Sequence, residues 1–249
     1  MNYLITGATS GLGNAIFKKL SLNVDDNFYL ISRNVGDVKS EELNKKNVKV
    51  YNTDLRNVKN TQNIVNKILQ DANDRIDVLI CNAAEGSFGN INEVPTEDFI
   101  NNLNTNFLSH LVLIKSIYPK MKKNDFGHII NISSGAAVFG FTNTASYSTS
   151  KSCMQILIES MYMENIKNNI HTKNIFPGLI DTDFETKNKV YNNIDKIPLF
   201  KKKDKNKIAE IIISKMFKKK LNIFCQLNPF LAFIIKVFPA IEKIRKLIL

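Results

Sequence analysis

The stretch NYLITGATSGLG, residues 2–13, joins a short apolar run to glycines at positions 7, 11 and 13. Residues 2–6 predict a β-strand, and the residues from about Leu12 predict a helix. Glycines allow a tight turn between the two and let the backbone approach a pyrophosphate, while the helix N-terminus offers free N–H groups and partial positive charge. The stretch therefore predicts the first βα unit of a dinucleotide-binding fold. The alternative is a tight turn that needs left-handed glycines and binds nothing.

The rest of the chain alternates strand-like runs with amphipathic segments. Strands are predicted at residues 27–32, 48–53, 76–82, 127–133, 171–176 and 221–227, and helices at about 58–69, 96–122, 145–168 and 205–218. This alternation predicts an α/β fold in which right-handed crossovers build a doubly wound parallel sheet of about seven strands, with helices on both faces. No linker divides the chain. We expect one catalytic, dinucleotide-binding domain over residues 1–227, followed by a basic amphipathic extension over 228–249.

Composition bounds the class of protein. The three cysteines, Cys81, Cys153 and Cys225, have neither disulfide-framework nor metal-ligand spacing, so we expect a reducing compartment and no metal site. The N-terminus lacks the pattern of a signal peptide, and no apolar run approaches the roughly 18 residues that span a bilayer. The sequence therefore predicts a cytoplasmic protein, with peripheral membrane contact left open by its C-terminal part.

The net charge of +11 is concentrated near the C-terminus, where residues 195–249 hold 14 Lys and Arg against 4 Asp and Glu. The final segment NPFLAFIIKVFPAIEKIRKLIL, residues 228–249, mixes apolar and basic residues and is interrupted by Pro239. Such a segment suits a helix lying in a membrane interface, attracted by anionic lipid. It equally suits packing over the substrate pocket or against a partner subunit. The sequence carries no nucleic-acid reading motif, so no nucleic-acid partner is predicted.

The ends of the predicted strands indicate how a cofactor would be bound. The second strand ends in LISRN, which places Arg33 where an acid would bind a ribose hydroxyl. Arginine suits a 2′-phosphate, which favours NADP(H) over NAD(H), unless Arg33 is simply a solvated surface residue. Asp54 follows the third strand and either accepts a hydrogen bond from the adenine amino group or caps the next helix. Asn82 and Ala83 follow the fourth strand beside the expected crevice.

Tyr147 and Lys151 lie four residues apart and share one face of a predicted helix. Ser134, thirteen residues before Tyr147, follows the fifth strand and should face the same crevice. A free tyrosine has a pKa near 10, and a neighbouring ammonium is expected to lower it toward the range of general acid/base catalysis. The Ser134 hydroxyl can then hydrogen-bond the substrate oxygen.

The motifs TGATSGLG, CNAA, NTNFLSH, YSTSK and FPGLIDT occur in an order that resembles the short-chain dehydrogenase/reductase family in its compact single-domain form. The resemblance runs from Met1 to about Leu227, with Ala84 replacing a customary glycine. It implies that Asn106 joins Ser134, Tyr147 and Lys151 in a catalytic tetrad, in which Tyr147 donates a proton to the nascent alkoxide and Asn106 holds a water. Lys151 would lower the Tyr147 pKa and bind the nicotinamide ribose.

The resemblance also implies a cofactor-contacting set. Besides Tyr147 and Lys151, that set is Gly7, Thr9, Ser10, Gly11, Leu12, Gly13, Arg33, Asp54, Leu55, Asn82, Ala83, Pro177, Gly178, Ile180 and Thr182. Thr9 and Ser10 stand where many NADP-preferring members carry a basic residue.

The predicted function is that of an NADP(H)-dependent oxidoreductase, which interconverts a small-molecule carbonyl and a secondary alcohol by hydride transfer. The alternative is a dinucleotide-binding scaffold or sensor that docks on a membrane through its C-terminal tail. Substrate should enter between loops 85–92, 135–144 and 181–200, which offer Phe88, Val138, Phe139, Phe141 and Phe184. The resemblance also implies a homo-dimer or tetramer, with the helices around Asn106 and Tyr147 as interface.

Overall fold

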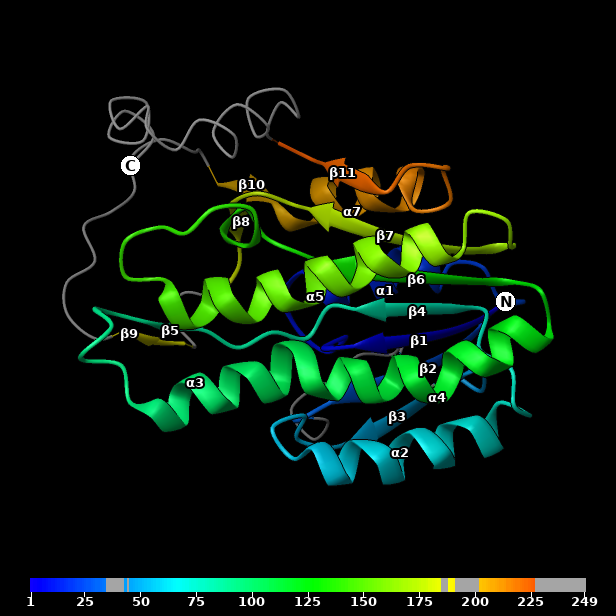
Figure 1. Ribbon diagram of the computed structural model, residues 1–249. Coiled ribbons are helices and arrows are strands. Elements are labelled where there is room, and N and C mark those ends of the chain that lie inside the picture. The colour runs from blue at the N-terminus through cyan, green and yellow to red at the C-terminus, as the bar shows by residue number, and fades with distance from the viewer. Residues whose placement is uncertain (35–42, 44, 185–187, 191–201, 227–249) are drawn as a thin grey trace.

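The computed structural model describes residues 1–34, 43, 45–184, 188–190 and 202–226 (Figure 1). Its centre is a seven-stranded sheet with the order β11-β7-β6-β4-β1-β2-β3. All of its strand pairs are parallel. The strands are β1 (Asn2–Thr6), β2 (Asn27–Ser32), β3 (Val48–Asn52), β4 (Val78–Cys81), β6 (Gly127–Ile132), β7 (Ile170–Phe176) and β11 (Asn222–Phe224). The chain runs outward from β1 to β3 and then returns to β4, so the strand order reverses between β1 and β4. This confirms the predicted doubly wound sheet, whose ligand crevice lies at such a switch point.

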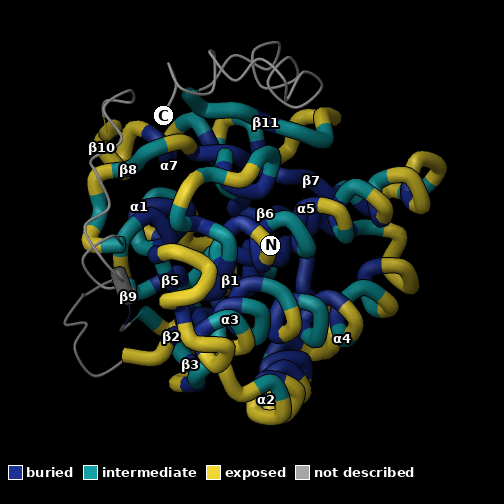
Figure 2. The backbone as a smooth tube through the Cα atoms, turned by 60° about the vertical axis from the view of Figure 1, so that its left-hand side comes forward, coloured by how far each residue is buried: buried dark blue, intermediate teal, exposed yellow. Residues whose placement is uncertain are grey.

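Helices cover both faces of the sheet (Figure 1). They are α1 (Gly11–Leu20), α2 (Val58–Asp71), α3 (Thr96–Leu103), α4 (Ser109–Lys123), α5 (Ala145–Glu164) and α7 (Lys205–Lys215). Successive strand residues point to opposite faces, so Ile5 of β1 packs in the apolar cluster shared with α1 and α7. Its neighbour Leu4 packs in the second cluster, shared with α2, α4 and α5. Figure 2 shows the central strands buried between these two layers, as parallel sheets require.

Several elements depart from the predicted boundaries. The single helix expected over 96–122 is divided by a π-helical turn, η2 (Asn104–Leu108), between α3 and α4. The helices α5 and α7 end earlier than predicted, at Glu164 and Lys215. The loops also contain short strands that were not predicted. Two of them, β5 (Ser87–Phe88) and β9 (Lys189–Val190), pair with each other, as do β8 (Ile180–Asp181) and β10 (Lys203–Asp204).

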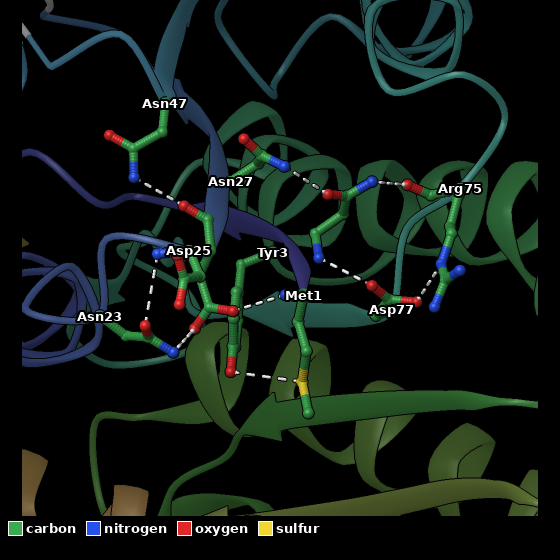
Figure 3. Close-up of polar contacts among 10 residues, drawn as sticks. Met1, Tyr3, Asn23, Asp25, Asn27, Asn47, Arg75 and Asp77 are labelled. Carbon is green, nitrogen blue, oxygen red and sulfur yellow. Dashed lines mark hydrogen bonds and ion pairs between the residues drawn. The ribbon is translucent and has the colours of Figure 1, made fainter.

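A polar network ties the start of β1 to the turn before β4 (Figure 3). The Asp77 carboxylate accepts hydrogen bonds from the Asn2 backbone N–H and from Arg75 Nε, both at 2.8 Å. The Asn2 side chain donates in turn to the Arg75 carbonyl at 2.7 Å. This end of the sheet is thereby fixed by structural contacts, and the candidate site residues gather at the opposite, carboxyl end.

The C-terminal extension predicted over 228–249 lies outside the described residues, as does most of the loop over 181–200 that was expected to border the substrate entrance. None of the helices in the described part of the chain combines the length and the apolar composition needed to cross a membrane.

Candidate active site

In the turn after β1, each glycine is favoured either by its backbone conformation or by close packing. Gly7 and Gly11 adopt φ values of +66° and +54°, a left-handed conformation that favours glycine. At Gly13 a Cβ atom would lie 2.2 Å from the Gly7 carbonyl oxygen and 2.4 Å from Asn82 Nδ2. The first turn of α1 therefore packs directly on the loop that precedes it.

The glycine turn has features that suit the pyrophosphate of a dinucleotide. The side chain of Ser10, the N-cap residue of α1, makes no capping hydrogen bond, and the first turn of α1 carries no acidic residue. Its N–H groups are therefore suited to an anion such as a pyrophosphate. Among the residues that the structure describes, a Cβ atom on Gly11 would meet only the side chain of Thr182, at 3.7 Å. The turn thus forms one wall of a cradle, and Thr182, which follows β8, forms the other.

A buried hub of hydrogen bonds holds the cradle in shape. Thr6 Oγ1 accepts from the backbone N–H groups of Asn82 and Ala83 at 3.0 and 2.9 Å and lies 2.9 Å from His110 Nε2. The other ring nitrogen of His110, Nδ1, lies 3.2 Å from the Asn106 carbonyl oxygen. Because a carbonyl can only accept, Nδ1 carries the proton and Nε2 accepts from the Thr6 hydroxyl. Burial lowers the pKa of His110 to about 4, which keeps the ring neutral for this role.

The sequence did not identify Thr6 or His110 as positioning residues. Asn82, which it did identify, also donates through Nδ2 to the carbonyls of Thr6 and Gly7 at 3.0 and 3.2 Å. The end of β4 is thus hydrogen-bonded to the glycine turn through both the backbone and the side chain of Asn82.

The structure brings Ser134, Tyr147 and Lys151 together at the end of β6. Lys151 is almost fully buried and donates from Nζ to the Ile132 carbonyl at 2.9 Å. The same atom lies 6.0 Å from the centre of the Tyr147 ring. The Ser134 hydroxyl lies close enough to the Tyr147 hydroxyl to lower its pKa, and Ser134 Oγ accepts from the Ala136 N–H at 3.2 Å. A phenol, an alcohol and an ammonium therefore converge on one corner.

Desolvation is the main cause of the pKa shifts of Tyr147 and Lys151. Burial raises the pKa of Tyr147 to about 12, and the hydrogen bond from Ser134 opposes that rise only in part. Burial also lowers the pKa of Lys151 to about 8. The expectation that Lys151 depresses the Tyr147 pKa is therefore wrong for the protein without cofactor. Loss of hydration outweighs the neighbouring cation, whose ammonium is directed at the Ile132 carbonyl.

Asn106 lies in the π-helical turn and is 1% exposed. Its side chain accepts from the Glu85 N–H and donates to the Glu85 carbonyl, both at 2.8 Å. Nδ2 also donates to Ser150 Oγ at 2.8 Å, and that hydroxyl donates to the Tyr147 carbonyl at 2.8 Å. Asn106 therefore cross-links the loop after β4 to the helix that carries Tyr147. The bound water that the family resemblance assigns to Asn106 stays a prediction.

Aromatic side chains wall the phenol on its open side. The rings of Phe88 and Phe184 lie 5.5 and 5.8 Å from the Tyr147 ring and 6.5 Å from each other, centre to centre. Phe139 and Phe141 form a separate pair at 4.9 Å. Asn188, which the sequence did not single out, accepts from the Gly86 N–H at 2.6 Å and so joins the two loops that bear the aromatic wall.

The opposite end of the crevice is charged. Arg33, directly after β2, has Nη1 3.8 Å from Oε2 of Glu85, a residue that the sequence analysis did not single out. Asp54, after β3, accepts from Arg56 Nε and Nη2 at 2.9 and 2.6 Å. Burial alone would raise the pKa of Asp54, but the bonds from Arg56 hold it below its usual value. The alternative that Asp54 caps the next helix is wrong, because Asn57 is the N-cap of α2; the adenine contact stays a prediction.

The remaining predicted residues surround the crevice. Leu12 and Leu55 are buried at 8% and 4% exposure, so only their backbones are available to a cofactor. Thr9 hydrogen-bonds Ser32 through their hydroxyls, which ties the glycine turn to the end of β2. Beyond Pro177, Gly178 has φ +81° and packs closely against Gln226, and Ile180 lies half-buried in β8. Within the described residues, no three His, Cys, Asp or Glu side chains are grouped to hold a metal ion.

Comparison with known proteins gives matches over most of the chain. The family model for short chain dehydrogenases matches residues 2–192. An uncharacterized oxidoreductase from Staphylococcus aureus strain MW2 is 27% identical over 215 residues, which cover 84% of this chain and 88% of the relative. A 3-oxoacyl-(acyl-carrier-protein) reductase from Rickettsia felis is 29% identical over 185 residues, which cover 74% of each chain.

Solved structures show the same fold at lower identity. A short-chain dehydrogenase from Sphingobium yanoikuyae in complex with NADPH aligns with a TM-score of 0.80 at 18% identity, over 98% of this chain and 93% of the other. A short-chain dehydrogenase/reductase from Burkholderia phymatum in complex with NAD also aligns with a TM-score of 0.80, at 16% identity, over 98% of this chain and 94% of the other.

Proposed function

Because this chain belongs to the short-chain dehydrogenase family and is an NAD(P)-dependent dehydrogenase/reductase, we propose that it is NADP(H)-dependent and interconverts a carbonyl and a secondary alcohol. The observation that carries the proposal is the convergence of Ser134, Tyr147 and Lys151 beside the glycine turn. A phenol that can move a proton, a hydroxyl that can hold an oxygen and a buried ammonium suit a carbonyl that becomes an alkoxide.

A bound nicotinamide dinucleotide supplies hydride in one direction and accepts it in the other. In the reductive direction Tyr147 is the proton donor to the substrate oxygen, and its raised pKa of about 12 keeps the phenol protonated until that oxygen gains negative charge. Ser134 hydrogen-bonds the same oxygen and orients it. Lys151, anchored on the Ile132 carbonyl, stabilises the phenolate that remains and is placed to bind the nicotinamide ribose.

The preference for NADP(H) rests on the end of β2. That strand ends in Ser32 and is followed by Arg33 and Asn34, with no carboxylate to bind a ribose hydroxyl. Half of the Arg33 side chain is exposed, at 48%, whereas Arg56 is held by two hydrogen bonds from its side chain to Asp54. Arg33 is therefore the arginine better placed to bind a 2′-phosphate. The two solved relatives hold NADPH and NAD, so they support the cofactor class and leave the preference to this argument.

The aromatic wall supports an apolar small-molecule substrate. Phe88 and Phe184 border the Tyr147 ring and supply apolar carbon surface beside it. An apolar pocket with one reactive polar corner orients a carbonyl by its oxygen and accepts its hydrocarbon part by burial. Nothing in the described part of the chain supports the alternative of a scaffold docked to a membrane.

Exposed apolar residues support a homo-dimer or tetramer. On α3, η2 and α5, Ile100, Leu108, Ile156 and Met163 are 51%, 37%, 53% and 65% exposed. Apolar side chains gathered on neighbouring helices suit an interface with a second copy. Light scattering after size-exclusion chromatography tests this, and a monomer at micromolar concentration would contradict it.

Cofactor binding to the full chain tests the proposed function. Fluorescence titration should show tighter binding of NADPH than of NADH. Arg33→Met should remove that preference by weakening NADPH about tenfold or more, because a hydrogen-bonded ion pair is lost. The matched variant Arg56→Met should keep the preference for NADPH. A preference for NADH, or an unchanged preference in Arg33→Met, would contradict the NADP(H) assignment; binding of neither cofactor would contradict the proposed function as a whole.

A further inference from the structure

Glu85 and Arg33 stand on either side of the glycine turn. The sheet order places β1 between β4 and β2. Glu85 lies shortly after β4, Arg33 directly after β2, and the turn at Gly7 after β1. The contact between Arg33 Nη1 and Glu85 Oε2, at 3.8 Å, therefore reaches across the carboxyl end of β1. That edge is where a dinucleotide would lie.

Of the two partners, Glu85 is the fixed one. Its backbone N–H and carbonyl are both bound by the Asn106 side chain at 2.8 Å, and its carboxylate accepts from Thr105 Oγ1 at 3.2 Å. Its side chain is 18% exposed, against 48% for that of Arg33. A long side chain that is half in solvent can leave a partner that is held from three directions. The Arg33 guanidinium is therefore the partner with more freedom to change position.

The neighbouring pair is arranged differently. Arg56 donates to the Asp54 carboxylate from Nε and Nη2 at 2.9 and 2.6 Å, and its backbone N–H bonds the same carboxylate at 3.0 Å. Two bonds from one guanidinium to one carboxylate form a stronger pair than a single contact at 3.8 Å. Arg33 is thus the more readily exchanged of the two arginines.

We propose that Glu85 is a specificity-determining residue, which holds the Arg33 guanidinium in the free protein and gives it up to the 2′-phosphate of NADPH. The inference rests on the proposed NADP(H) preference. A phosphate and a carboxylate compete for the same guanidinium, so Glu85 weakens NADPH binding. NADH has no 2′-phosphate to bind Arg33, so its binding leaves the contact between Arg33 and Glu85 intact.

The test is a titration of the full chain with NADPH and NADH, followed by cofactor fluorescence. Glu85→Gln preserves the size of the side chain, an acceptor for Thr105 and the backbone bonds to Asn106. It should tighten NADPH binding by about threefold, NADH binding by less, and the gain should shrink as salt screens the charges. Equal changes for the two cofactors, or no change, would overturn the proposal.

A double-variant comparison separates exchange from general repulsion. With Arg33→Met already present, adding Glu85→Gln should leave the NADPH-to-NADH affinity ratio unchanged, because no guanidinium remains to be released. A ratio that still rises would mean that Glu85 acts only as a nearby negative charge, which overturns the exchange. Thr105→Val is the matched control, since it removes the other contact of the carboxylate and should preserve the ratio.

The outcomes also separate this inference from the proposed function. If Arg33→Met has no effect on either cofactor, the assignment of Arg33 as the 2′-phosphate ligand fails, and the role of Glu85 fails with it. If Arg33→Met removes the NADPH preference while Glu85→Gln leaves it unaltered, only the role of Glu85 fails. Thermal unfolding of each variant confirms that the folded chain is being compared.

Discussion

The ammonium of Lys151 lies 6.0 Å from the centre of the Tyr147 ring. Its position is set by a strand end, because Nζ donates to the last carbonyl of β6. Burial lowers the pKa of the lysine to about 8 and raises that of the tyrosine to about 12. The ionised forms of both groups are thus kept from water, which is a cost to folding and is consistent with the proposed catalytic role.

Replacing Lys151 should make the protein more stable and less active. At pH 7 the lysine is charged in both states but desolvated only in the folded one, so Lys151→Met should raise the free energy of unfolding by about 1 to 3 kcal/mol. Denaturant unfolding measures this, and turnover should fall in parallel. Lys173→Met is the matched variant. Lys173 is buried in β7, and burial also lowers its pKa, to about 8, so its loss should stabilise the fold while turnover is kept.

The lowered pKa of Lys151 also determines how the stability of the protein changes with pH. The pKa of Lys151 is about 8 in the folded chain, whereas the ordinary pKa of a lysine is 10.5, so between these two pH values the unfolded chain binds more protons. The contribution of Lys151 to stability therefore rises with pH across that window, and the difference between wild type and Lys151→Met should narrow there. A difference that widens from pH 8 to pH 10 would contradict the assignment.

The buried hydrogen bonds of Thr6 predict a large loss of stability when its hydroxyl group is removed. Thr6→Val removes the oxygen that accepts from the N–H groups of Asn82 and Ala83 and that pairs with His110. Leaving these buried groups unsatisfied should cost about 2 to 4 kcal/mol in unfolding free energy and weaken cofactor binding. Thr172→Val, which loses one buried bond to the Ile158 carbonyl, should cost about 1 kcal/mol and preserve cofactor binding. Similar losses of stability and of cofactor binding in the two variants would contradict the role of Thr6 in holding the site together.

The glycine turn can be tested at Gly13. An added methyl group would meet the Gly7 carbonyl at 2.2 Å, so Gly13→Ala must displace the turn from the helix. We expect cofactor binding to be lost, with destabilisation of about 1 to 3 kcal/mol as for other overpacked sites. Gly140→Ala, where no atom of the described residues lies within 4 Å of the added carbon, should bind cofactor normally. Normal binding by Gly13→Ala would show that the turn tolerates a side chain and is not built for close approach.

The sequence was sufficient for the sheet and for the convergence of Ser134, Tyr147 and Lys151, because both follow from local patterns. Alternating apolar runs and amphipathic segments predict a parallel sheet, and a parallel sheet brings its strand ends to one edge. That is why Ser134 and Tyr147, on different elements, could be expected to meet.

Contacts that depend on tertiary packing were beyond the sequence. The π-helical turn at Asn106 has no signature in the letters NTNFL, and the helix was predicted to be continuous. Glu85 has no local partner pattern, because the residues that bind it, Arg33 and Asn106, come from other parts of the chain. The Tyr147 pKa was misjudged for a related reason: helical spacing reveals the nearby ammonium, whereas desolvation depends on how many groups pack around the phenol.

The most direct test of the proposed chemistry compares wild type with Tyr147→Phe in NADPH-dependent reduction of a panel of apolar ketones and aldehydes, with cofactor affinity measured on the same samples. The variant should bind NADPH within about twofold of wild type and lose turnover by about 100-fold or more, since only the proton donor is removed. Tyr162→Phe, about four turns further along α5, should retain turnover. Undiminished turnover in Tyr147→Phe would contradict the assignment of Tyr147 as the general acid.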